Sequence, residues 1–131
     1  MNRSYLDVEV QNWADYSEFY ACKQMIDRSR LEEKVILIAD RGYENYNIFA
    51  HVEEKNWEYL IRVKDIASNG IVSGLGITEK GTLDKNVSLT LTRTQTKAKK
   101  TEDYKFMPTC QGFDYIPIGS KKEYTLHFRV V

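Results

Sequence analysis

The stretch VILIADRGYENY, residues 35–46, decides how this chain can fold. Its first five residues are apolar, and they are followed directly by Asp40, Arg41 and Gly42. A continuous apolar run of this length is typical of a central strand whose two faces are both covered in an α/β sheet. Ligands of such sheets gather at the carboxyl ends of the strands. The sequence therefore predicts a buried strand at 35–39 that presents the Asp40 carboxylate at a ligand-binding edge.

Helical segments flank this strand in the sequence. The periodicity of residues 15–30 predicts a first helix that begins at a cap formed by Asp15 or Ser17. Residues 44–55 predict a second helix, and residues 57–63 predict the next strand. A strand, a helix and a strand joined by short turns form a right-handed parallel crossover. The residues expected to face the core are Phe19, Cys22, Met25, Ile26, Ile48, Phe49 and Val52.

The N-terminal residues 5–11, YLDVEVQ, alternate between apolar and polar side chains. This period of two predicts a half-buried strand. Asp7 and Glu9 share its polar face. They are either a pair of catalytic carboxylates or part of a solvated strand face.

The character of the sequence changes in the middle of the chain. Residues 66–81 hold four of the seven glycines and predict a boundary or a long connection. Residues 87–91 and 124–130 then alternate between apolar and polar side chains, which indicates antiparallel strands. We therefore expect an α/β unit in residues 1–65 and a β-rich unit in residues 66–131.

The composition is typical of a soluble globular protein, with 42% hydrophobic and 29% charged residues among 131. No apolar run approaches the roughly 20 residues that a membrane span needs. The first residues lack the apolar core of a signal peptide, so we expect a cytoplasmic protein. Cys22 and Cys110 are far apart and predict two reduced thiols, while His51 and His127 have no partner at zinc-ligand spacing.

The net charge is zero, but the charges are unevenly distributed. Residues 1–65 contain 9 basic and 13 acidic residues, whereas residues 66–131 contain 10 basic and 6 acidic residues. The overall balance does not indicate nucleic-acid binding, and the second half leans toward it. Four of its basic residues lie in RTQTKAKK, residues 93–100. This run is either a phosphate-contacting loop or a solubilising hairpin tip.

Three roles are open for Asp40 on physical grounds. A carboxylate at a strand end is a good ligand for Mg²⁺, and Arg41 can pair with it or reach a phosphate. A receiver-like signalling domain uses such an aspartate as a phosphoryl acceptor. A purely structural aspartate caps the turn that follows the strand. Gly42 permits a tight exit turn in each case.

Residues 38–65, IADRGYENYNIFAHVEEKNWEYLIRVKD, resemble the region around the second acidic residue of bacterial insertion-sequence transposases of the DDE class. The matching features are the apolar strand, the DRGY segment at 40–43 and the strand that closes on IRVKD at 61–65. The resemblance is dense over these residues and looser on both sides of them.

This resemblance implies a partial RNase H-like core, a mixed sheet with flanking helices, followed by a mostly antiparallel β insertion. It implies that Asp40 is the second of three acidic residues that hold two Mg²⁺ (or Mn²⁺) ions for DNA cleavage and strand transfer. The implied partner is DNA at the element ends, near the nucleoid of a bacterium, with no membrane and no small-molecule substrate. The residues expected to contact DNA are Arg41, Arg62, Lys64, Arg93, Lys97, Lys99 and Lys100.

The sequence also departs from this family. No strand that ends in a first catalytic Asp precedes residues 5–11, and Ile66 stands where the spacing from Tyr59 and Arg62 would place the catalytic Glu. The chain also stops at HFRVV, inside a strand pattern. We therefore expect a central piece of a transposase that is inactive alone, or a non-catalytic nucleic-acid-binding or dimerisation remnant. Exposed sheet edges in such a piece predict self-association.

Overall fold

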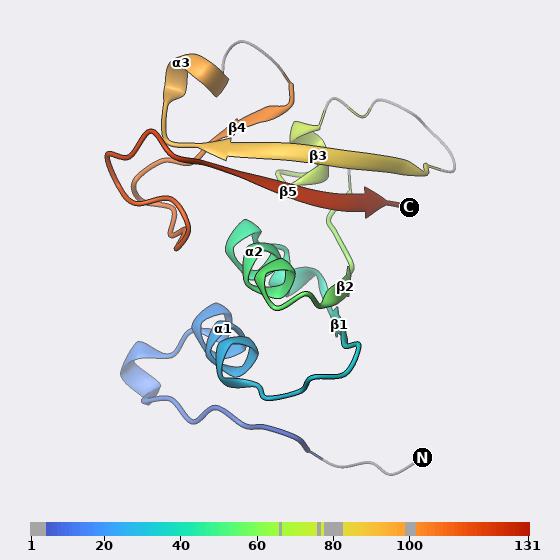
Figure 1. Cartoon of the computed structure of the whole chain (residues 1–131), viewed down its shortest axis with the longest axis vertical. Helices are drawn as coiled ribbons and strands as arrows, with labels where there is room; N and C mark the ends of the chain where they lie inside the picture. Colours follow the sequence, from blue (N-terminus) through green and yellow to red (C-terminus); the bar gives the residue numbers. More distant parts are fainter. Residues whose placement is uncertain (1–4, 66, 76, 78–82, 99–101) are drawn as a thin grey trace.

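The structure is a computed structural model that describes residues 5–65, 67–75, 77, 83–98 and 102–131. It contains a two-stranded and a three-stranded sheet, with the helix α2 packed against both, as Figure 1 shows. None of the helices in this described part is long and apolar enough to span a membrane. The elements in chain order are η1 (Trp13–Asp15), α1 (Glu18–Arg28), β1 (Ile36–Ala39), η2 (Arg41–Tyr43), α2 (Tyr46–Glu54), β2 (Glu58–Ile61), η3 (Val72–Gly74), β3 (Lys85–Thr92), α3 (Gln95–Ala98), β4 (Tyr104–Phe106) and β5 (Glu123–Val130).

The helix α1 begins where the sequence provides a cap. The Ser17 hydroxyl accepts a hydrogen bond from the Tyr20 amide at 3.3 Å, so Ser17 rather than Asp15 caps the helix. Cys22 and Ile26 are its buried residues, and the helix packs against α2. The predicted apolar side is therefore present in part, on a helix somewhat shorter than the predicted one, and the prediction that Phe19 faces the core is wrong because its side chain is 41% exposed.

The predicted parallel crossover is confirmed. β1 and β2 pair in parallel, with Ile36 opposite Glu58 and Ala39 opposite Ile61. The helix α2 connects them, and Asn45 caps it by accepting hydrogen bonds from two amides of its first turn. This arrangement brings the carboxyl ends of both strands to one edge of the sheet.

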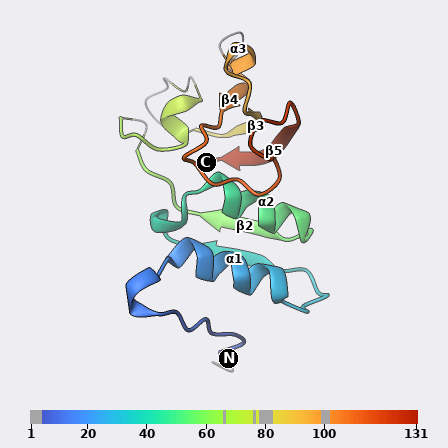
Figure 2. The same ribbon diagram turned by 90° about the vertical axis from the view of Figure 1, so that its left-hand side faces the viewer.

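The prediction that the strand at 35–39 is covered on both faces is wrong. Both α1 and α2 lie on one side of the β1–β2 sheet, which Figure 2 shows with α1 toward the viewer. On the other face, Ile36 and Ile38 are 53% and 74% exposed. The apolar run therefore forms a strand, but nothing in the described part of the chain covers its outer face.

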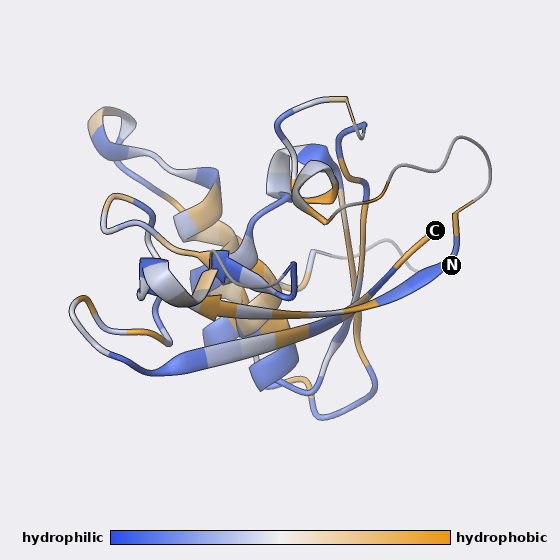
Figure 3. Ribbon diagram, turned by 90° about the horizontal axis from the view of Figure 1, so that it is seen from above, coloured by the Kyte–Doolittle hydropathy of each residue, from blue (hydrophilic) through white to orange (hydrophobic). Residues whose placement is uncertain are grey.

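The second sheet has the strand order β4-β3-β5. β3 and β5 are antiparallel, as their alternation predicts, and Leu89 lies opposite Leu126. Polar and apolar segments alternate along these two long strands (Figure 3), and the inner side chains Leu89, Leu91 and Leu126 are buried. β4 pairs in parallel with β3. No sequence pattern indicates β4, because three residues are too few to show a period.

Phe49 on α2 connects the two sheets. Its ring stacks on Tyr59 of β2 at a centroid distance of 4.8 Å and meets Phe128 of β5 edge to face at 6.1 Å. Buried side chains from both halves of the chain form one hydrophobic cluster around this contact. The β-rich half is therefore packed onto the α/β half through α2.

The prediction of a strand at residues 5–11 is wrong. These residues have no regular secondary structure, and Leu6 is 78% exposed. The Arg28 guanidinium at the end of α1 holds them by bonding Asp7 at 2.6 and 2.9 Å and by pairing with Glu9. This contact lowers the pKa of Asp7. A strand needs a neighbour to satisfy its backbone, and no described strand lies beside this segment.

Candidate functional site

Asp40 lies at the carboxyl end of β1. Its Oδ1 accepts a hydrogen bond from the Arg41 amide at 2.7 Å, and its carbonyl accepts one from the Tyr43 amide at 2.9 Å. Asp40 therefore caps η2, which is one of the three roles that the sequence leaves open. Its second carboxylate oxygen has no hydrogen bond to any described residue, and both Asp40 and the neighbouring Arg41 are exposed. A capping role and a ligand-binding role are thus compatible in one side chain.

Gly42 is not required by the turn that follows β1. Among the described glycines, Gly119 has a positive φ, at 78°, and Gly42 does not. A Cβ atom added at Gly42 would have no other atom within 4 Å. The tight exit turn that the sequence predicts is present as η2, but the structure does not need a glycine at position 42 to form it, and the missing side chain leaves open space beside η2.

The residues that follow β2 reach the same edge of the sheet as Asp40. The Arg62 amide donates to the Ala39 carbonyl at 3.2 Å, which places Arg62 beside the residue that precedes Asp40. The Lys64 amide donates to Glu44 Oε2 at 3.0 Å. Arg62 and Lys64 are both exposed. The parallel pairing thus brings together three residues that the sequence predicts as site residues.

Glu44 fixes the backbone that leaves this edge. Its two carboxylate oxygens accept hydrogen bonds from the Lys64 and Ile71 amides. Gly70 packs so closely that an added Cβ would lie 2.7 Å from Glu44 Oε1 and 2.9 Å from Lys64 Cβ. Here the close approach does require a glycine. The connection after β2 is therefore held against the segment between β1 and α2.

Arg93, predicted as a DNA contact, has an internal role at the end of β3. Its guanidinium donates to four backbone carbonyls, those of Met107, Pro108, Phe113 and Ile116, at 2.8 to 3.4 Å. The structure does not bring this side chain to the Asp40 edge. Lys97 lies on α3, while Lys99, Lys100 and Ile66 lie outside the described residues. Whether the 93–100 run contacts DNA stays a prediction.

The Asp40 edge does not form a complete metal site from the described residues. Within them, no group of three His, Cys, Asp or Glu side chains is placed to hold a metal ion. Asp40 offers one carboxylate, whereas a two-metal site needs several ligands that bridge or surround both ions. The residues described here therefore do not fit a two-metal centre by themselves.

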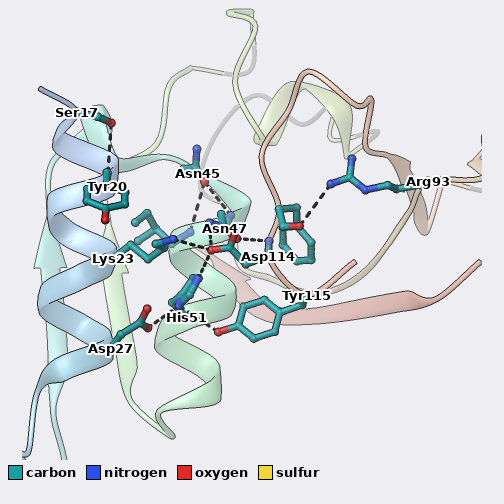
Figure 4. A network of polar contacts seen from close by, with 12 residues as sticks. Ser17, Tyr20, Lys23, Asp27, Asn45, Asn47, His51, Arg93, Asp114 and Tyr115 are labelled. Carbon is teal, nitrogen blue, oxygen red and sulfur yellow. Dashed lines mark hydrogen bonds and ion pairs between the residues drawn. The ribbon is translucent and has the colours of Figure 1, made fainter. Parts of the chain in front are cut away.

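A polar cluster that no sequence pattern indicates surrounds His51 on α2, and Figure 4 shows it. His51 is 6% exposed. Its Nδ1 lies 2.6 Å from Asp27 Oδ1 and 3.1 Å from the Tyr115 hydroxyl, and its Nε2 lies 2.9 Å from Asp114 Oδ2. Both nitrogens can donate to carboxylates at once only in the doubly protonated ring. The cluster joins α1, α2 and the loop 107–122.

Asp114 is the most connected member of this cluster. Besides His51, it accepts hydrogen bonds from Lys23 Nζ at 3.0 Å and Asn47 Nδ2 at 3.1 Å. Its partial burial opposes ionisation, but the hydrogen bonds from Asn47, Lys23 and His51 outweigh this and lower the pKa of Asp114 to about 2. No sequence pattern connects these residues, because they come from distant parts of the chain. Their bonds fix the loop 107–122 against the helices.

Comparison with known protein families identifies the chain. The family model described as Transposase DDE domain matches residues 4–112, a range that includes Asp40, the β1–β2 sheet and both β3 and β4. No curated protein and no solved structure matches the chain. The mixed α/β arrangement is consistent with the predicted partial RNase H-like fold. Because the match covers most of its length, the chain belongs to the DDE transposase family.

Proposed function

We propose that this chain serves in the metal-dependent cleavage and strand transfer of DNA at the ends of a bacterial insertion sequence. The observation that carries the proposal is the position of Asp40 at the end of β1, within the matched range and on the same edge as Arg62 and Lys64. DDE transposases generally use divalent metal ions and act on DNA. The family match gives no support to a receiver-like role for Asp40.

In this proposal Asp40 is the second acidic residue of the catalytic set. The hydrogen bond from the Arg41 amide fixes the orientation of the carboxylate, and its other oxygen makes no hydrogen bond to any described residue. Such a carboxylate is a suitable ligand for Mg²⁺ (or Mn²⁺), which binds hard oxygen atoms. The other acidic residues would come from outside the described residues. The chain alone is therefore expected to be inactive, with residues 1–65 as part of the catalytic core and residues 66–131 as the insertion.

The cationic side chains near Asp40 support DNA as the partner. Arg41 lies on η2 directly after Asp40, and Arg62 and Lys64 follow the neighbouring strand. All three are exposed. Arginine and lysine at such an edge are suited to hold backbone phosphates. We assign them this role, in a reaction that takes place at the bacterial nucleoid.

The first test is to sequence the DNA on both sides of the coding region. The proposal expects an upstream strand that ends in Asp and a downstream helix that bears Glu, with Tyr and Arg before it. In the protein that contains them, Asp40→Asn should reduce Mg²⁺-dependent strand transfer to background, because it removes one metal ligand. Asp103→Asn changes an exposed aspartate that directly precedes β4 and is the matched control. Unchanged strand transfer by Asp40→Asn would contradict the proposal.

A second assay addresses the chain by itself. Supercoiled plasmid is incubated with the chain and Mn²⁺, and nicked product is measured for the natural sequence and for Asp40→Ala. We expect no nicking above background from either protein. Nicking that Asp40→Ala abolishes would show that the chain carries a working site of its own.

A second candidate function is a non-catalytic dimerisation or DNA-binding module. The observation that favours it is the uncovered outer face of the β1–β2 sheet, where Ile36, Ile38 and Leu60 are each more than half exposed. Contiguous exposed apolar side chains mark interaction sites. Sedimentation of the purified chain over a range of concentrations tests this function, and a monomer at all concentrations would exclude dimerisation.

A further inference from the structure

A polar hollow lies where the two halves of the chain meet. Its volume is about 220 Å³. One wall comes from the turn before α2 and from the backbone after β2, and the other from β4 and the loop that follows it. The polar side chains that line the hollow are Glu44, Asn45, Lys64, Asn69, Lys105 and Gln111.

The hollow lies at the Asp40 edge of the sheet. Asp40 caps η2, and Glu44 and Asn45 follow η2 directly. Lys64 follows β2, whose carboxyl end lies beside that of β1 because the two strands are parallel. The hollow therefore combines residues of the proposed catalytic edge with Lys105 from the β-rich half.

The hollow is suited to an anion. The ammonium groups of Lys64 and Lys105 make no hydrogen bond or ion pair with any other described residue, so their donors are free for a ligand. Glu44 is the carboxylate in the wall, and both its oxygens accept backbone amides. The hollow is thus lined by two lysines and by one glutamate whose carboxylate is already hydrogen-bonded. The balance of charge in the hollow is positive.

Neutral donors complete the lining. The Asn45 Oδ1 atom caps α2 by accepting the amides of Asn47 at 2.8 Å and Ile48 at 3.4 Å. Its Nδ2 group consequently remains as a donor. Gln111 contributes a second amide side chain from the opposite wall. Ammonium and amide donors around a space of this size are the groups that recognise a phosphate.

We propose that the polar hollow binds a backbone phosphate of the DNA strand that approaches Asp40. The inference rests on the proposed function, and it adds Lys105 and Gln111 to the residues that position DNA. It also gives the β-rich half a direct part in holding the substrate, because Lys105 lies on β4. Phosphate contacts of this kind position a strand without reading its sequence.

The test compares two double variants that lose the same charge. Lys64→Ala/Lys105→Ala empties the hollow of its cations. Lys34→Ala/Lys121→Ala removes two exposed lysines elsewhere, at the amino end of β1 and before β5. Binding of a labelled 30-base-pair duplex of mixed sequence is measured by fluorescence anisotropy between about 50 and 200 mM NaCl, and circular dichroism checks that each variant is folded.

We expect the hollow variant to bind the duplex about tenfold more weakly at 100 mM salt, and its negative slope of log K against log salt should become shallower by about 1 to 2. The control variant should keep the slope of the natural sequence. Gln111→Glu adds a carboxylate to the hollow and should also weaken binding. An equal loss in the two double variants would overturn the inference, because it would indicate only a general charge effect.

Two further outcomes distinguish a failure of the inference about the hollow from a failure of the proposed function. If the natural sequence does not bind the duplex at any salt concentration, the proposed DNA partner fails together with the hollow. If inorganic phosphate binds to the natural sequence in calorimetry, and Lys64→Ala/Lys105→Ala abolishes this without changing duplex binding, the hollow holds free phosphate. The inference about DNA would then be wrong, while the proposed function would stand.

Discussion

The two sheets of this protein differ in the side chains that they expose to water. The three-stranded sheet alternates regularly, with Leu126 buried on its inner face and Thr125 exposed on its outer face. The β1–β2 sheet carries apolar side chains on both faces, and its outer face exposes Ile38 and Leu60 at 74% and 59%. The three-stranded sheet thus has a buried apolar face and a polar outer face. The β1–β2 sheet, which carries Asp40 at its edge, has an exposed apolar outer face instead.

The sharpest test of this contrast uses two leucines of different environments. Leu126 is fully buried on β5, and Leu60 is exposed on β2. Leu126→Ala should lower the free energy of unfolding by about 2–5 kcal/mol, because it leaves a cavity in the core. Leu60→Ala should change it by no more than about 0.5 kcal/mol. Urea denaturation at low protein concentration measures both, and a large loss at Leu60 would show that its face is covered in solution.

The two histidines provide a second matched pair. His51 is buried between Asp27 and Asp114, whereas His127 lies exposed on the outer face of β5. His51→Ala should cost about 2 kcal/mol of unfolding free energy, because it removes a buried ring that contacts two carboxylates and the Tyr115 hydroxyl. His127→Ala should have a much smaller effect, and equal losses would contradict the structural role assigned to the His51 cluster.

The uncovered face predicts a measurable effect on association. If two copies cover each other through the β1–β2 sheet, Ile38→Lys should weaken the dimer by about 1.5 kcal/mol, roughly tenfold in the dissociation constant, because it puts a charge in the apolar contact. Thr125→Lys makes the same addition on the outer face of β5 and should leave the constant unchanged. Analytical ultracentrifugation measures both, and a dimer unaffected by Ile38→Lys would place the contact elsewhere.

The smallest expected effect is on the pH dependence of stability. The pKa of Asp114 is lowered to about 2, below its ordinary value of 3.8, so its ionised form is favoured in the folded state. Its contribution is complete above the ordinary value and is lost as the pH falls through about 2. Asp114→Asn should therefore lose less stability between pH 5 and pH 2 than the natural sequence, whereas Asp103→Asn should follow the natural sequence closely.

Periodicity predicted the elements that are long or uniformly apolar. The run at 35–39, the helix that contains Phe49 and the alternating strands around Leu89 and Leu126 all lie where the pattern places them. The motif also located Asp40 at the end of its strand. These features follow from local spacing, which a single sequence displays directly.

The remaining features depend on contacts between distant segments. The alternation of residues 5–11 has no neighbouring strand to pair with, so the pattern alone did not produce a strand. The apolar composition of β1 predicts that both its faces are covered, but burial depends on which other segments pack against the strand. The Asp27–His51–Asp114 cluster and the wall that Lys105 adds to the polar hollow both arise only after folding brings remote residues together.

The hydrogen bonds from Arg93 to four carbonyls affect the interpretation of any substitution at this position. Met107, Pro108, Phe113 and Ile116 span the loop that also carries Asp114 and Gln111. One guanidinium therefore sets the shape of a segment that serves both the His51 cluster and the polar hollow. A change at Arg93 should therefore alter both stability and the proposed phosphate binding, and a defect in DNA binding from such a variant would not identify Arg93 as a DNA contact.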